Sequence, residues 1–338
     1  MYNIESSLLL VGCSFSGNTA IYGGGIFSED VSLIMRNCAF RGNSSRWRGG
    51  AIFNILGTDM VVTNCRFSGN SSSLGGAIDS SESTKLTLMN CTFAGNENVL
   101  SSTDFLTLEP PSMSSRVWVT NCIFWDGGNE ILNLNGGPIT VRYSDIQGGR
   151  KSVSDPYGGV IWGIGNIDAD PCFAEPGYWD SNEVWVDGDY HLKSQAGRWE
   201  PSENPKSEIR NQKLAEGKWV IDEVTSLCID AGNPGSPLGD EPITIPADPN
   251  NQWGENLRIN MGAYGGTAEA SMPPYNWTLF ADLTNDGIVD FVDLMHWIEY
   301  WLSADNELPA DLDRNKVSDL ADFEVFADNW LKQTSWHN

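Results

Sequence analysis

The sequence GCSFSGN (12–18) recurs without gaps as NCAFRGN (37–43), NCRFSGN (64–70) and NCTFAGN (90–96). A fifth copy, NCIFWDGGN (121–129), carries two extra residues. The cysteines fall at positions 13, 38, 65, 91 and 122, so successive copies lie 25, 27, 26 and 31 residues apart. Self-similarity at such a period indicates a repeat architecture, and the fold must explain it before anything else.

A second landmark lies between these copies, as GGGIF (23–27), GGAIF (49–53) and GGAID (75–79). A third stretch in each repeat alternates apolar and polar residues, as half-buried strands do. These stretches are VSLIM (31–35), DMVVT (59–63), KLTLM (85–89) and RVWVT (116–120). Three short strands in about 26 residues fit one coil of a parallel β-helix, whereas a propeller blade needs roughly 40 residues and helical solenoids need helical periodicity.

Equivalent positions of successive coils stack at the inter-strand spacing of about 4.8 Å. The repeat therefore predicts buried ladders of like side chains. Free cysteine is a small, readily buried hydrophobe, so we interpret the thiols as core packing. The side-chain amides of the asparagines should bond along the helix axis at turns, where a left-handed conformation suits asparagine. The predicted ladders are Cys13, Cys38, Cys65, Cys91 and Cys122; Phe15, Phe40, Phe67, Phe93 and Phe124; and Asn18, Asn43, Asn70 and Asn96.

The N-C-x-F-x-G-N and G-G-A-I motifs of residues 5–135 resemble the right-handed parallel β-helix repeats of polymorphic outer-membrane-type surface proteins and of many secreted bacterial proteins. This resemblance implies an all-β, right-handed parallel β-helix with about 26 residues per coil. It implies little about function, because adhesins, lyases and depolymerases share the architecture. VRYSDIQGG (141–149) reads as a final regular coil, so we assign residues 1–150 to the coils.

Recognisable blocks continue past the regular repeat: GNIDADPCF (165–173), DGDYHLKSQAG (187–197), SLCIDAG (226–232) and RINMGAYGG (258–266). This series resembles the C-terminal end of secreted β-helix proteins and implies an irregular cap over residues 151–272. Solenoids need such caps to cover the open end of the core. Residues 198–220 and 234–257 are expected to be surface loops inserted into it. Cys172 and Cys228 could form a disulfide in an oxidising exterior or remain two buried thiols.

Pro273-Pro274 marks a linker (273–277), after which two twelve-residue acidic segments follow, DLTNDGIVDFVD (282–293) and DLDRNKVSDLAD (311–322). Calcium takes six to eight oxygen ligands, and an EF-type loop presents them from positions 1, 3, 5, 7, 9 and 12. The predicted ligands of the first Ca²⁺ are Asp282, Thr284, Asp286, the Ile288 carbonyl, Asp290 and Asp293. Those of the second are Asp311, Asp313, Asn315, the Val317 carbonyl, Asp319 and Asp322. Gly287 suits the sharp turn at position 6, whereas Lys316 at the matching place is a departure that weakens the second prediction.

An amphipathic helix is predicted after each loop, over LMHWIEYWL (294–302) and FEVFADNWL (323–331). A duplicated loop–helix unit of this kind resembles the type I dockerin domain, over residues 278–333, which leaves 334–338 as a tail. The resemblance implies a cohesin-like protein partner. The residues before the closing Asp, often Ser-Thr in that family, are Phe291-Val292 and Leu320-Ala321 here, so a more apolar partner surface is expected.

The formal net charge of −25 argues against nucleic acid or an anionic membrane as a partner. No run of eighteen apolar residues occurs, so we expect no membrane span. The N-terminal MYNIESSLLLVGCSF lacks a basic start and a cleavage site. We therefore expect an extracellular or cell-surface protein that lacks its N-terminal part.

The leading functional prediction is a binding protein whose β-helix meets carbohydrate or another surface while the calcium module attaches it. The alternatives are a polysaccharide lyase or glycoside hydrolase delivered by a dockerin, or a calcium module with a purely structural role. Acids and bases on the coils are too scattered to single out catalytic residues, and we interpret them as surface charge. The candidates are Asp59, Asp79, Glu82, Asp104 and Glu109, with Arg36, Arg46, Arg48, Arg116 and Arg142.

Overall fold

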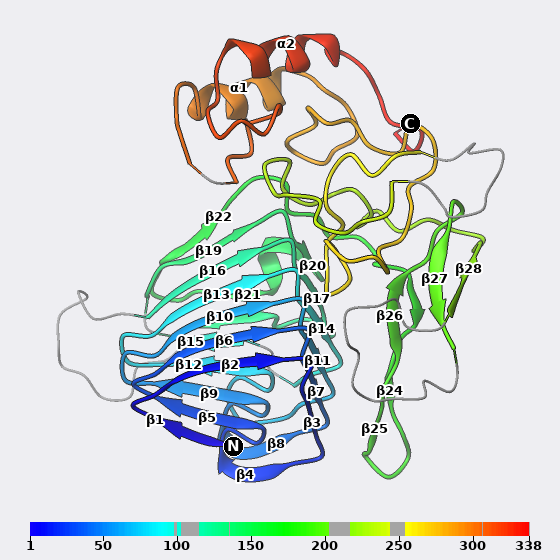
Figure 1. Cartoon of the computed structure of the whole chain (residues 1–338). Coiled ribbons are helices and arrows are strands. Elements are labelled where there is room, and N and C mark those ends of the chain that lie inside the picture. The colour runs from blue at the N-terminus through cyan, green and yellow to red at the C-terminus, as the bar shows by residue number, and fades with distance from the viewer. Residues whose placement is uncertain are drawn as a thin grey trace.

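The computed structural model describes residues 1–97, 100–102, 115–134, 136–202, 217–243, 254–305 and 307–337. Three parallel sheets run side by side along the N-terminal half, and each coil contributes one strand to each sheet (Figure 1). This confirms the predicted parallel β-helix.

The first sheet contains β1 (Tyr2–Ile4), β5 (Ile26–Glu29), β9 (Ile52–Ile55), β12 (Ile78–Ser80), β15 (Leu100–Ser102), β18 (Ile131–Asn133) and β21 (Val153–Ser154). The second contains β2 (Ser7–Val11), β6 (Ser32–Arg36), β10 (Asp59–Thr63), β13 (Lys85–Met89), β16 (Arg116–Thr120), β19 (Ile139–Arg142) and β22 (Val160–Trp162). The third contains β3 (Ser14–Ser16), β7 (Ala39–Arg41), β11 (Arg66–Ser68), β14 (Thr92–Ala94), β17 (Ile123–Trp125) and β20 (Asp145–Ile146). A further parallel pair joins β4 (Thr19–Tyr22) to β8 (Ser44–Arg48).

The predicted phenylalanine ladder runs through the core, with successive ring centroids 4.8, 4.9, 4.8 and 4.4 Å apart and the rings nearly parallel. Four of the five rings are fully buried, and each such burial stabilises the fold by about 1.5–3 kcal/mol. The cysteine ladder lies beside it as free thiols. Its sulfurs accept hydrogen bonds along the axis, for example from the Cys38 amide to Cys65 Sγ at 3.3 Å.

The predicted asparagine ladder is also present. Asn43 Oδ1 accepts from the amide and the side chain of Asn18, and Asn70 and Asn96 repeat this arrangement one coil further on. The left-handed residues are different from those expected, however. They are the asparagines that precede four of the five ladder cysteines, such as Asn64 with φ 52°, and the glycines that precede each ladder asparagine, such as Gly69 with φ 59°. The ladder asparagines thus supply hydrogen bonds, while their neighbours make the turn.

The Gly-Gly corners bring consecutive coils into direct backbone contact. Gly49 has φ 62°, and a Cβ on Gly50 would lie 2.1 Å from the carbonyl oxygen of Gly76. Only glycine fits such an approach.

The hydrogen-bond ladder of the cysteines continues into the next coil with a different residue. Ser144 occupies the cysteine position, and its Oγ accepts a hydrogen bond from the Cys122 amide at 3.1 Å. Parallel pairing then continues to Trp162, past the predicted boundary at residue 150.

A short 3₁₀ helix, η2 (Gly149–Ser152), precedes the last parallel strands, β21 and β22, and beyond β22 the strands pair antiparallel. The pairs are β23 (Phe173–Glu175) with β26 (Asp189–Leu192), β24 (Tyr178–Trp179) with β25 (Trp185–Val186), and β27 (Arg198–Pro201) with β28 (Gly217–Val220). The last pair corrects the expectation of a surface loop at the two flanks of 198–220, where paired strands form and Arg198 and Trp199 are buried. Residues 203–216, and residues 244–253 of the second expected loop, lie outside the described residues. The β24–β25 hairpin lies beside the coils, where Trp179 Nε1 donates to the carbonyl of Gly95 at 3.2 Å (Figure 1).

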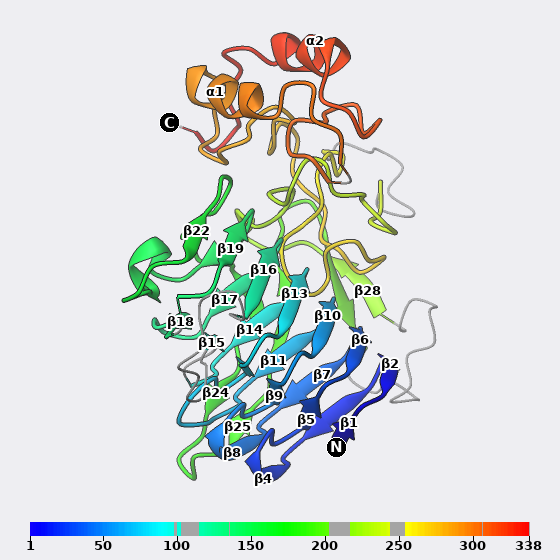
Figure 2. The same cartoon turned by 90° about the vertical axis from the view of Figure 1, so that its left-hand side faces the viewer.

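Two α-helices follow, α1 (Phe291–Glu299) and α2 (Leu320–Asp328), and they sit beyond the last coils with irregular chain between (Figure 2). Both begin before the predicted starts at residues 294 and 323. The reason is local, because Asp290 and Asp319 act as N-caps and fix the first turn earlier. Trp297 and Phe326 are the buried anchors of the two helices.

Candidate metal centre

The two acidic loops each gather three carboxylates. Asp282, Asp286 and Asp293 have ligand atoms within 4.8 Å of one another, and so do Asp311, Asp313 and Asp322. These six residues belong to the predicted ligand sets. Oxygen-only groups of this kind suit a hard divalent cation such as Ca²⁺.

The loops share one internal hydrogen-bond pattern although their sequences differ. At position 1, Asp282 Oδ2 accepts from the amide of Gly287 and Asp311 Oδ2 accepts from the amide of Lys316, both at 2.8 Å. At position 12, Asp293 Oδ1 accepts from the Thr284 amide at 3.1 Å. In the second loop, Asp322 Oδ1 accepts from the Asp313 amide at 2.9 Å. Each loop is therefore wrapped around its first and last carboxylates.

The carboxylates at positions 9 and 12 also build the start of the following helix. Asp290 caps α1, and its own amide donates to Asp293 Oδ2 at 2.9 Å. Asp319 and Asp322 repeat this capping box on α2 at 2.7 Å. A capping box satisfies two amides that a helix leaves unpaired, so metal loop and helix form one unit.

The predicted ligands at positions 3, 5 and 7 have further partners, some inside the loops and some outside them. The Thr284 hydroxyl donates to Asp293 Oδ1 at 3.1 Å, and Asn315 Nδ2 donates to Asp313 Oδ2 at 2.9 Å. The position-7 residues Ile288 and Val317 lie in isolated antiparallel bridges. Ile288 pairs with Gln333 after α2, and Val317 pairs with Ala304 after α1. Each loop is thus held by the segment that follows the other helix.

Position 6 distinguishes the two loops. Gly287 has φ 89° and Lys316 has φ 77°, so both adopt the left-handed backbone that the turn requires. A non-glycine residue there costs about 1–2 kcal/mol. Lys316 therefore adopts the same turn as Gly287, with a strained backbone.

The buried carboxylates of the first loop are not fully compensated by positive charge. Asp282 and Asp293 are almost fully buried, and burial raises the pKa of Asp282 to about 6 and also raises that of Asp293. Neighbouring carboxylates push in the same direction, while Arg258 opposes the shift at Asp282. Burial likewise raises the pKa of Asp311. A bound divalent cation would remove this penalty, so the donor sets fit such an ion at both loops.

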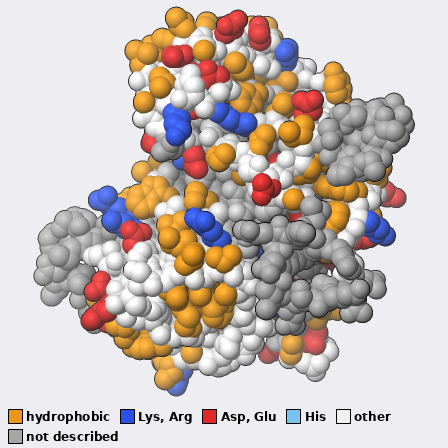
Figure 3. Space-filling model, in the orientation of Figure 1, with side chains coloured by type: hydrophobic (Ala, Val, Ile, Leu, Met, Phe, Trp, Pro, Cys, Tyr) orange, Lys and Arg blue, Asp and Glu red, His pale blue; other side chains and the backbone are white. Residues whose placement is uncertain are grey.

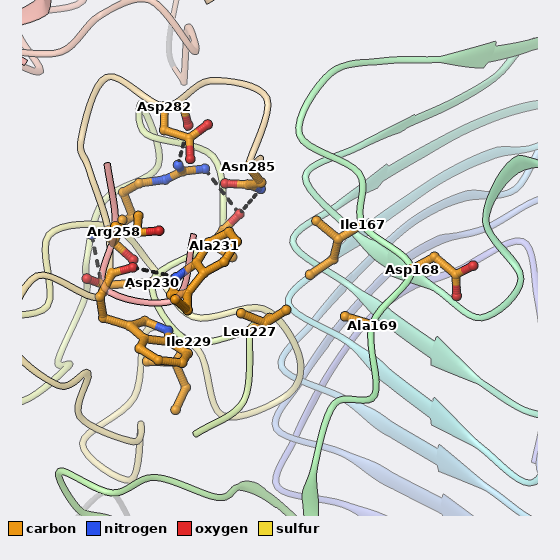
Figure 4. Close-up of a pocket in the computed structure, with 14 residues that line it drawn as sticks. Ile167, Asp168, Ala169, Leu227, Ile229, Asp230, Ala231, Arg258, Asp282 and Asn285 are labelled. Atoms are coloured by element: carbon orange, nitrogen blue, oxygen red, sulfur yellow. Dashed lines mark hydrogen bonds between the residues drawn. The ribbon is translucent and has the colours of Figure 1, made fainter. Parts of the chain in front are cut away.

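Arg258 links the cap to the first loop, as the close-up of the junction shows (Figure 4). It is fully buried and donates through Nη1 to the Asp282 carbonyl at 2.6 Å and through Nε to the Gly232 carbonyl at 2.7 Å. A cavity of about 250 Å³ adjoins it and reaches Asp168 on the β-helix side. We did not single out Arg258 from the sequence, where it sits inside RINMGAYGG.

Position 4 of each loop also contacts the cap. Asn285 Nδ2 donates to the carbonyls of Gly165 and Ala231, both at 2.8 Å. Arg314 Nη2 donates to the Leu257 carbonyl at 2.7 Å. The loops therefore face the end of the β-helix, and the helices face away from it.

The acids and bases considered on the coils do not gather into one exposed site. Asp79 pairs with Arg48 at 3.6 Å, with both side chains buried, while Asp59 is exposed on the second sheet. Asp104 and Glu109 lie outside the described residues. His191 is buried between Asp189 and Glu269, with 3.2 Å from Nε2 to Glu269 Oε2.

Two aspartates of the cap accept hydrogen bonds from backbone amides of segments distant in the chain. Asp168 Oδ1 accepts from the Gly148 amide at 2.9 Å, and Asp230 Oδ2 accepts from the Leu257 amide at 3.0 Å. Cys172 and Cys228 were expected either to form a disulfide or to remain two thiols, and in the structure they are free thiols. Cys228 Sγ donates to Asp145 Oδ2 at 3.2 Å.

These features define a class, a parallel β-helix repeat protein with a short C-terminal module of two acidic loop–helix units. A sequence model of the Chlamydia polymorphic membrane protein repeat matches residues 64–81 of the chain, which contain NCRFSGN and the GGAI of the next corner. Neither the curated proteins nor the solved structures gave a match. Among the described residues, neither helix is long and apolar enough to cross a membrane.

Proposed function

We propose that this chain is an extracellular or cell-surface β-helix protein whose C-terminal module binds two calcium ions. The proposal is carried chiefly by the two loops, because different sequences gather three carboxylates each and build the same hydrogen bonds around those at positions 1 and 12. Chance acidic turns have no reason to agree in this way. Similarity to a repeat of polymorphic membrane proteins supports a place at the cell surface.

The module would also be the attachment point. Its helices carry large apolar side chains that face solvent, and such patches mark protein-interaction sites. The exposed apolar residues of this face are Phe291, Val292, Met295, Ile298, Trp301, Leu302, Leu320, Phe323 and Leu331. They include the positions before the closing aspartates that the dockerin resemblance associates with a cohesin-like partner. The β-helix, in this scheme, presents its long faces to carbohydrate.

Calcium binding to the full chain, measured by titration calorimetry, tests the metal proposal. We expect two sites in the wild type and one in each of the variants Asp293→Asn and Asp322→Asn. Asp328→Asn, an exposed change at the end of α2, should keep both. Absence of binding at millimolar calcium would refute the proposal.

Attachment is tested by capture of the cohesin-like partner in calcium and in chelator. The exposed substitutions Phe291→Glu and Leu320→Glu should abolish capture while leaving calcium binding intact. If calcium raises the melting temperature and neither helix variant alters capture, the module is purely structural. The enzymatic alternative is tested separately on acidic polysaccharides, where a product with a new ultraviolet-absorbing double bond would show a lyase.

A further inference from the structure

The outer face of the second sheet carries a largely apolar row, five apolar residues and two threonines, that crosses all seven coils. In-register pairing places the middle residue of each strand beside that of the next. The row consists of Leu9, Ile34, Val61, Thr87, Trp118, Thr140 and Ile161. Leu9, Trp118 and Ile161 are 59%, 40% and 56% exposed, while Val61, Thr87 and Thr140 between them are half-buried. A continuous row of this length differs from the scattered apolar residues of an ordinary surface.

Basic side chains flank this row. The outward residues on its two sides include Arg36 and Arg142 on one side and Lys85 and Arg116 on the other. Among the described strand residues of this outer face, Asp59 is the single acid. None of the four basic residues forms an ion pair with a carboxylate of the described chain. Apolar and basic side chains gather on this face in the space-filling view (Figure 3).

The charge of this face is opposite to that of the molecule. A net charge of −25 belongs to the whole chain, whereas the charged outward strand residues of this sheet are four cations and one acid, Asp59, in register beside Lys85. This local excess of positive charge attracts an anionic ligand. A second copy placed face to face would bring like charges together and is disfavoured. Duplex DNA carries a charge about every 1.7 Å and would be repelled strongly by the rest of the protein. A polymer with sparser charge fits better.

We propose that this face binds an anionic polysaccharide, a chain of uronic acid or otherwise acidic sugar residues lying along the coils. The apolar row would contact the non-polar faces of the sugar rings, with Trp118 as the aromatic platform. The flanking arginines and lysine would pair with the carboxylates. Coils repeat about every 4.8 Å, so successive sugars meet successive coils. This inference rests on the proposed role of the β-helix as the presenting element, and calcium binding does not bear on it.

Binding of polygalacturonate to the full chain in calcium-containing buffer tests the proposal, with fully methyl-esterified polygalacturonate as the uncharged counterpart. We expect the esterified polymer to bind at least about tenfold more weakly, a difference of about 1.4 kcal/mol. The variant Arg36→Gln/Lys85→Gln/Arg116→Gln should lose a similar factor, and Trp118→Ala severalfold. The substituted side chains are exposed, so the fold is preserved.

A matched control keeps the test specific. Arg46→Gln/Trp47→Ala changes the same residue types on β8, outside this sheet, where Arg46 lies 5.0 Å from the Trp47 ring centroid. It should bind like the wild type. Equal loss in this control, equal binding of the esterified polymer, or no binding of polygalacturonate would each overturn the proposal. So would tighter binding of a DNA duplex or of anionic vesicles with the same dependence on the three cations. Calcium titrations of the same variants show separately whether the module is intact.

Discussion

The coils and the C-terminal half hold themselves together in different ways. In the coils, Phe67 stacks on Phe40 and Phe93, and Asn70 bonds to Asn43 and Asn96, so each interaction is repeated one coil away. In the cap and module, Arg258 makes contacts that occur once and join segments far apart in the chain. Stability is therefore distributed in the first region and concentrated in the second, as expected when nearest-neighbour interfaces dominate a solenoid.

The largest loss of stability should follow from removing the Arg258 side chain. Arg258→Ala leaves the carbonyls of Gly232 and Asp282 unpaired and opens a void beneath the first loop. We expect the free energy of unfolding of the cap and module to fall by about 3–5 kcal/mol, as for a broken buried charged network. Urea denaturation followed by tryptophan fluorescence would measure it, with the exposed Arg36→Ala as control. An unchanged midpoint would mean that the module is held elsewhere.

A central member of the asparagine ladder should matter less. Asn70→Ala removes hydrogen bonds to the Phe40 carbonyl and to Asn96, and leaves Asn43 without its acceptor. We expect a loss of about 2–3 kcal/mol, since buried groups left unpaired cost about 1–3 kcal/mol. Asn18→Ala, at the first coil, should cost visibly less because Asn18 bonds to a neighbour on one side. Equal losses in the two variants, measured by thermal denaturation, would argue that stability is not shared between neighbouring asparagines of the ladder.

A pH titration tests the boundary between the two regions. Burial raises the pKa of Asp145 to about 8, while the Ala169 amide and the Cys228 thiol pull it down. The folded state keeps a proton that the unfolded state loses above about pH 4. This carboxyl therefore lowers stability as pH rises from about 4 to about 8, by up to about 1.4 kcal/mol per pH unit. Asp145→Asn should flatten that part of the stability–pH curve from urea midpoints, and an unaltered slope would contradict the assignment.

The smallest expected effect lies inside the module. Lys316→Gly relieves left-handed strain and should raise the free energy of unfolding by about 1 kcal/mol. Gly287→Ala at the matching place should lower it, because a Cβ there would lie 2.8 Å from Thr334 Oγ1. Calorimetric melting of both variants measures the pair of changes. Opposite signs are expected, and a shared sign would mean that the two loops are not equivalent.

The same contrast explains what could be predicted from the sequence. The ladders repeat, so Phe67 and Asn70 are visible as periodic positions, and the acidic loops are visible because spacing alone defines them. Arg258 and Glu241 are not visible, because each acts once, on backbone groups brought near by folding. The helix starts were missed for a related reason, since Asp290 and Asp319 were considered as ligands and not also as caps.

The sameness of successive coils also has a genetic consequence. The four repeats from residue 12 to residue 96 present the same asparagine and phenylalanine to their neighbours, so any of these coils can follow any other. An in-frame duplication or deletion of one repeat would keep the ladders continuous. It would leave the cap undisturbed only outside the coils that the cap contacts side-on, where Asn64 donates to the Ala263 carbonyl and Asn90 to the Asn260 carbonyl. The length of the rod, and with it the reach of anything at its far end, could therefore change in whole-coil steps by recombination between repeats.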